Sequence, residues 1–90
     1  MTYVIEDAFH AEWVDEHATY EAAVARLREI AATPWHVAPN VTPCMTRECR
    51  RTYHLIEYEQ TSTGWTEVRN QLALEVSAAG VTWAPGFGPD

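Results

Sequence analysis

The sequence predicts a small α+β fold, a two-layer sandwich in which one amphipathic helix packs on a four- or five-stranded, mainly antiparallel sheet. Three observations lead to this fold class. The 90 residues are enough for one domain with one modest core. One segment, at about 19–32, has helical periodicity, whereas the segments before and after it are rich in β-branched and aromatic residues. Short turns between the last segments favour antiparallel pairing of consecutive strands.

The first elements are expected to be extended. Residues 3–5 are strand formers, and apolar and polar residues alternate over 9–14, which is the period of a half-buried strand. We therefore expect one long bent strand, or a short hairpin that turns at residues 6–8. The alternation places Trp13 inside the protein and His10 outside it.

The helix is expected over about residues 19–32. Thr19 is a suitable N-cap, and Glu21 follows in the first turn, where the helix dipole favours a carboxylate. Pro34 ends the pattern, because the residue before a proline resists helical geometry. The apolar positions recur at intervals of three and four on one face. They are Ala23, Val24, Leu27, Ile30 and Ala31.

The second half of the chain begins with a long connection over 33–51 that contains three prolines and shows no sustained period. A connection of this length in a compact domain is usually functional or disordered, and its apolar residues favour an ordered loop. Strand and turn signals then alternate to the end of the chain. They predict strands over 52–60, 65–76 and 81–83, separated by turns at 61–64 and 78–80. We expect one domain over 1–84 and a frayed tail over 85–90.

Composition and charge limit the classes of partner. Thirteen Asp and Glu residues against six Arg and no Lys give a net charge of −7. A nucleic-acid-binding surface needs a basic stripe, so we expect no nucleic acid partner. The first residues lack a basic leader and an apolar run, and no stretch of eighteen apolar residues occurs. We therefore expect no signal peptide, no membrane anchor and a cytoplasmic location.

Both cysteines lie in the segment 42–51, which reads TPCMTRECRR. Cys44 and Cys49, with His36 before them and His54 after them, offer four ligands of the type that zinc prefers in proteins. A disulfide between the two cysteines would close a small ring, although a reducing compartment disfavours it. Free thiols that pack the loop are the third alternative. The sequence leaves all three open.

A longer pattern resembles the zinc-dependent nucleoside and base deaminases. His10-Ala11-Glu12 precedes Pro43-Cys44 and Cys49, as His-x-Glu precedes Pro-Cys-x-x-Cys in that family. The resemblance implies zinc on His10, Cys44 and Cys49, and proton transfer by Glu12. Here four residues rather than two separate the cysteines, and the His-x-Glu element is expected in a strand instead of at the start of a helix.

The strand expected over 53–60 has apolar residues on both faces. Tyr53 and Leu55 lie on one face, and further apolar residues lie on the other. A single helix covers only one face of a sheet, so the remaining face requires either internal cover or a partner. We take Tyr53 and Leu55 as candidate partner contacts.

An arginine cluster follows the cysteines and consists of Arg47, Arg50 and Arg51. Arginine binds carboxylates and phosphates through its planar fork, so the cluster is a candidate contact for an anion or an acidic partner. Internal ion pairs with Glu57 or Glu59 are the favoured alternative.

These observations favour a non-catalytic, acidic, cytoplasmic module without a cofactor. We expect it to bind another protein, or a second copy of itself, through a sheet face or the loop 34–51, because no catalytic constellation stands out in the sequence. The alternative hypothesis is a small zinc protein that uses Cys44 and Cys49 with histidines. Its site would be structural or, as in the deaminases, hydrolytic.

Overall fold

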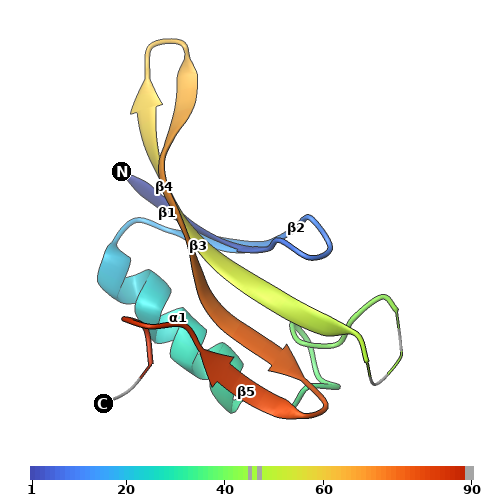
Figure 1. Cartoon of the computed structure of the whole chain (residues 1–90). Helices are drawn as coiled ribbons and strands as arrows, with labels where there is room; N and C mark the ends of the chain where they lie inside the picture. Colours follow the sequence, from blue (N-terminus) through green and yellow to red (C-terminus); the bar gives the residue numbers. More distant parts are fainter. Residues whose placement is uncertain (45, 47, 89–90) are drawn as a thin grey trace.

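A computed structural model of the chain describes residues 1–44, 46 and 48–88. The described residues form α1 (Tyr20–Ala32) and the strands β1 (Thr2–Asp7), β2 (Glu12–His17), β3 (Arg50–Thr61), β4 (Gly64–Ser77) and β5 (Gly80–Trp83). All pairs are antiparallel, and the strands lie in the order β2-β1-β3-β4-β5 (Figure 1). The predicted class, one helix on an antiparallel sheet, is confirmed. No helix among the described residues is long and apolar enough to cross a membrane.

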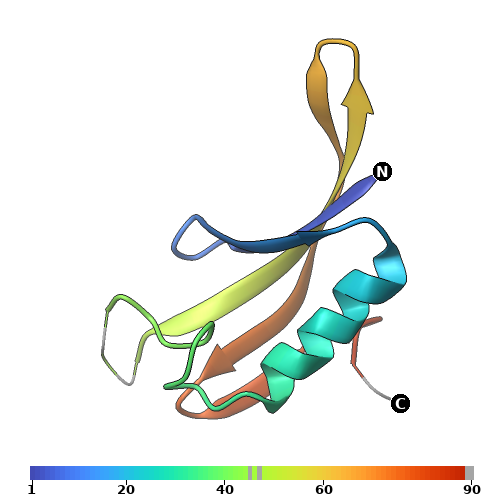
Figure 2. The same cartoon turned by 180° about the vertical axis from the view of Figure 1, so that it is seen from behind.

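The helix α1 packs on one face of the sheet, and the far end of the β3–β4 hairpin extends beyond it (Figures 1 and 2). Thr19 caps its first turn, because its Oγ1 accepts a hydrogen bond from the Ala22 N–H at 3.1 Å. The helix ends at Ala32, with Thr33 as its C-cap before Pro34. Its buried residues lie on the predicted face, and they are Ala23, Leu27 and Ile30.

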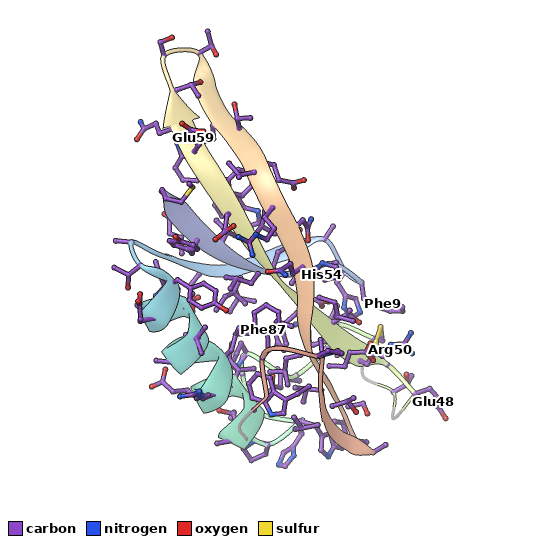
Figure 3. All side chains as sticks on the ribbon, turned by 60° about the vertical axis from the view of Figure 1, so that its left-hand side comes forward. Phe9, Glu48, Arg50, His54, Glu59 and Phe87 are labelled. Carbon is purple, nitrogen blue, oxygen red and sulfur yellow. A yellow bond between two sulfur atoms is a disulfide. The ribbon has the colours of Figure 1, made fainter. Side chains whose placement is uncertain are left out.

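The core lies between α1 and the sheet. It consists of Ile5, Ala23, Leu27, Ile30, Tyr53, Leu55, Ala73, Leu74, Val76 and Phe87. Phe87 belongs to the segment that the sequence predicts as a frayed tail, yet it is only 6% exposed and lies between the helix and the sheet (Figure 3). Burial of a phenylalanine ring offsets the entropy of ordering this short segment. Residues 89 and 90 of the predicted tail lie outside the described residues.

The first hairpin corrects the prediction for Trp13. Its turn lies at residues 8–11 instead of 6–8, and the indole is 54% exposed on the sheet face opposite α1. The pairing of β1 with β2 shifts between Ile5 and Glu6, since Ile5 pairs with Asp15 and Glu6 pairs with Trp13. This bulge inserts one residue and reverses the face on which the following side chains lie.

Candidate metal centre

The β1–β2 turn and the loop between α1 and β3 lie at the same end of the sheet (Figures 1 and 2). The turn carries His10, and the loop carries Cys44 and Cys49. The His10 Nε2 atom lies 3.1 Å from Cys44 Sγ and 3.2 Å from Cys49 Sγ. Figure 3 shows this end of the molecule, with Phe9, Arg50 and Glu48 labelled around the sulfur atoms.

The two cysteines form a disulfide in this structure. Cys49 is only 7% exposed, whereas Cys44 is exposed. A disulfide has no thiolate to offer a metal, but the reduced pair has two, and thiolates are strong ligands for zinc. In a tetrahedral zinc site a histidine nitrogen and a cysteine sulfur lie about 3.6 Å apart, as follows from their usual bond lengths to the metal. The two observed nitrogen–sulfur distances are close to this value. The two sulfur atoms are bonded to each other here, so they would have to separate after reduction before all three atoms could hold one metal ion.

Asp7 contacts the ring nitrogen of His10 that lies away from the sulfur atoms. Its side chain is fully buried, and Oδ2 lies 2.5 Å from His10 Nδ1. The other oxygen, Oδ1, accepts hydrogen bonds from the backbone N–H groups of Phe9 and Thr52, each at 3.0 Å. A carboxylate accepts from Nδ1–H, so the ring presents the lone pair of Nε2 to the sulfur atoms. Carboxylates support metal-binding histidines in this way in many proteins.

The charge of Asp7 is stabilised by its neighbours. Burial alone raises the pKa of its carboxyl group, but hydrogen bonds from Arg51, from the Thr52 N–H and from His10 outweigh burial, and the pKa is lowered. Asp7 is therefore ionised at neutral pH, as the support of a histidine ligand requires.

Arg51 joins the two segments that form the site. Its Nη1 donates to Asp7 Oδ2 at 2.8 Å and also to Glu12, and its Nη2 donates to the Val41 carbonyl at 2.6 Å. Burial lowers the pKa of Arg51, but the hydrogen bonds to Asp7 and Glu12 outweigh it, so the pKa is raised. The guanidinium thus ties the loop to the β1–β2 hairpin.

The predicted histidine ligands lie elsewhere. His36 is exposed, with its ring against Trp35, and His54 Nδ1 lies 2.7 Å from Asn70 Oδ1 across β3 and β4. In the part of the chain that the structure describes, the ligand clusters that contain a cysteine include neither histidine. His10, and not His36 or His54, is the histidine beside the cysteines, because the strand order brings the β1–β2 turn next to the loop.

The deaminase-like pattern named the three residues that the structure brings together, His10, Cys44 and Cys49. The surroundings differ from that family. His10 lies in a turn between two strands, and Glu12, the predicted proton carrier, is ion-paired with Arg51. The likeness therefore extends to the three candidate ligands and does not include the element that carries the histidine.

Within the arginine cluster, Arg50 and Arg51 form ion pairs inside the chain, but not with the predicted partners. Arg51 binds Asp7 and Glu12, whereas Glu57 pairs with Arg69 at 2.9 Å. Glu57 lies on the same strand as Arg51, and six residues of strand span about 20 Å, which is beyond the reach of the two side chains. The neighbouring strand β1 instead places Asp7 beside Arg51.

The remaining candidate contacts have different environments. Arg50 lies with its Cζ 5.2 Å from the centre of the Phe9 ring, near the cysteines. Arg47 lies outside the described residues. Tyr53 and Leu55 are at most 1% exposed, so they are core residues instead of surface contacts for a partner. The helix α1 covers the face on which they lie.

Comparisons of the chain with models of known protein families, with curated proteins and with solved structures find no match.

Proposed function

We propose that this protein, in its reduced form, binds a zinc ion through His10 Nε2, Cys44 Sγ and Cys49 Sγ. The observation that carries the proposal is the convergence of these three atoms from distant segments. His10 is 34 residues from Cys44 and 39 residues from Cys49, yet its Nε2 lies beside both sulfur atoms. Imidazole nitrogen with thiolate sulfur is a ligand set typical of zinc.

The buried carboxylate of Asp7 supports the same proposal. A histidine that serves only for packing does not require a buried carboxylate at its Nδ1 atom. Here a fully buried, ionised carboxylate lies at hydrogen-bond distance from Nδ1 and is itself held by Arg51. This arrangement orients the ring and raises its basicity toward a metal.

Three protein ligands leave one position of a tetrahedral zinc site for another group. Cys44 is exposed, so this position faces solvent and is open to water or to a small ligand. The metal would fasten the loop to the β1–β2 turn, as the disulfide does in this structure. We therefore propose a binding role and assign no reaction to the site.

Binding depends on the oxidation state of the cysteines. Conversion of the disulfide to two thiols takes two electrons and two protons, which a thiol reductant supplies, and zinc then displaces the thiol protons. We propose a cytoplasmic location, because thiols stay reduced in that compartment. The disulfide form would represent the same protein under oxidising conditions.

The test is metal binding by protein that has been treated with a chelator and then kept reduced without oxygen. We expect native mass spectrometry to show one zinc per chain, and cobalt substitution to give the thiolate absorption bands of a tetrahedral site. His10→Ala and Cys49→Ser should each weaken zinc binding at least about tenfold in competition with a chromophoric chelator.

His36→Ala and His54→Ala are the matched controls and should bind zinc as the unmodified chain does. If the reduced protein takes up no zinc, or if His10→Ala binds as tightly as the unmodified protein, the proposed site is wrong.

A further inference from the structure

The sheet face opposite α1 carries three aromatic side chains that form one surface. They are Trp13 from β2, Tyr58 from β3 and Trp65 from β4, and we call them the aromatic patch. The ring centres lie 6.3 Å apart for the two tryptophans, and 6.4 Å and 5.6 Å from Tyr58 to Trp13 and to Trp65. The patch thus joins three strands that are not all neighbours in the sheet.

Two buried residues lie on the same sheet face as the aromatic patch. Val4 and Ile56 pair across β1 and β3 on the same face, and neither is more than 1% exposed. This second, smaller core explains why β3 has apolar residues on both faces. Trp13 and Trp65 nevertheless remain 54% and 44% exposed, so a large area of indole surface faces solvent.

Two carboxylates lie beside the aromatic patch. Glu6 pairs with Trp13 in the β1–β2 register, and Glu67 pairs with Tyr58 in the β3–β4 register, so both carboxylates lie on this face. Burial raises the pKa of Tyr58, and the negative charges of Glu67 and Glu6 raise it further.

No arginine of the described residues offsets these carboxylates. The helix carries two arginines, and Arg51 is buried. Arg50 lies over the ring of Phe9. Arg69 pairs with Glu57, which lies on the same face of β3 as the core residue Leu55 and therefore faces away from the aromatic patch. The aromatic patch is therefore both electron-rich and negatively charged.

We propose that the aromatic patch binds lysine or arginine side chains presented by a basic segment of a partner protein. The faces of aromatic rings attract cations, and tryptophan does so most strongly. Carboxylates beside the rings add attraction and direct a cation to them. A second copy of this chain is a poor occupant, since two molecules of net charge −7 repel each other. The proposal is independent of the metal site.

The test uses a ten-residue peptide of alternating lysine and glycine, titrated into the isotopically labelled full chain at low ionic strength. We expect saturable shifts in the backbone amide signals of β2, β3 and β4 near the aromatic patch. Trp65→Leu should weaken binding at least about tenfold, and the double substitution Glu6→Gln with Glu67→Gln should weaken it several-fold. The two glutamine replacements keep the side-chain shapes, so they test the charges in a folded protein.

Trp35→Leu is the matched control, because Trp35 is a similarly exposed tryptophan, 37% exposed, in the loop after α1. It should bind the peptide as the unmodified chain does. The same peptide with glutamate in place of lysine should not bind. Absence of binding by millimolar lysine peptide overturns the proposal, and so does unchanged binding by Trp65→Leu. Tetramethylammonium that matches the peptide in affinity also overturns it, since the occupant would then be a small free cation.

Discussion

At the scale of single residues, the Asp7 carboxylate connects several parts of the candidate site through hydrogen bonds. Its two oxygens accept from His10, Arg51 and the Thr52 N–H, so one carboxylate fixes a histidine, a guanidinium and the start of β3. Nothing in the linear sequence distinguishes Asp7 from the other acidic residues. Its role depends on the pairing of β1 with β3, which brings Arg51 beside it.

We predict that Asp7→Asn lowers the zinc affinity of the reduced protein about 10- to 100-fold, because the neutral amide no longer supports the histidine as a ligand. Competition with a chromophoric chelator measures the effect. Glu12→Gln is the control, since Glu12 also binds Arg51 and makes no hydrogen bond with His10. Equal losses for the two variants would show that Asp7 acts only through Arg51.

Tyr53 is a second residue whose environment predicts a measurable effect. Its hydroxyl is buried and donates to Asn40 Oδ1 at 2.7 Å, and burial raises its pKa well above the usual range. Above about pH 10 the unfolded chain loses the tyrosine proton while the folded chain keeps it. The free energy of unfolding should therefore decrease as the pH rises beyond that value.

We expect Tyr53→Phe to unfold more easily at pH 8 by about 1–2 kcal/mol, because Asn40 loses a hydrogen-bond partner. The same variant should show a smaller further loss between pH 8 and pH 11 than the unmodified protein. Urea unfolding of the disulfide form at the two pH values measures both effects. An equal alkaline loss in the two proteins would assign it to other groups.

At the scale of elements, local signals predict α1 with its bounds, whereas for the first hairpin they give the wrong turn and do not reveal the bulge. Thr19 and Pro34 mark the ends of the helix within its own sequence, so no distant contact is needed to find it. The hairpin is set by a bulge at Ile5 and Glu6 and by a turn with a positive φ of 55° at Ala11. Alternation alone does not reveal an inserted residue, and for that reason it predicts the wrong face for Trp13.

The end of α1 depends on Asn40, which is 1% exposed. Its Nδ2 donates to the carbonyls of Ile30 and Thr33 at 3.0 Å and 2.8 Å, in the last turn and at the C-cap, where the regular helical hydrogen bonds end. We predict that Asn40→Ala lowers the free energy of unfolding by about 2–3 kcal/mol, because several buried polar groups lose their partners.

Urea unfolding measures this loss, and Asn70→Ala is a suitable control because Asn70 is an exposed asparagine in β4. A loss for Asn40→Ala of less than about 0.5 kcal/mol, the usual range for surface changes, would contradict the capping role.

At the scale of the whole molecule, the proposed metal site depends on the strand order. The sequence supplied the two cysteines and, through the deaminase-like pattern, the histidine, but spacing along the chain favoured His36 and His54. Only the order β2-β1-β3 places the β1–β2 turn beside the loop that carries Cys44 and Cys49. A site assembled from segments 34 and 39 residues apart is not visible as a short motif.

The same geometry predicts three levels of stability for one chain. A ring closed between Cys44 and Cys49, which are 5 positions apart, is worth about 2 kcal/mol by loop-closure entropy. Zinc at 1,000 times its dissociation constant stabilises the reduced form by about 4 kcal/mol. The melting temperature should therefore rise from the reduced metal-free form to the disulfide form and then to the reduced zinc form. In a chain of this size each kcal/mol corresponds to about 4–8 °C.

Differential scanning calorimetry of the three forms, with Cys44→Ser as the control, decides whether the cysteines are the metal ligands. Cys44→Ser cannot form the disulfide and lacks one ligand, so reductant should leave its melting temperature unchanged and zinc should raise it far less. An equal rise with zinc in the disulfide form would place the ion on the neighbouring cluster of Asp7, His10 and Glu12. Because that cluster contains no sulfur, dependence of the zinc effect on reductant is the result that separates the two sites.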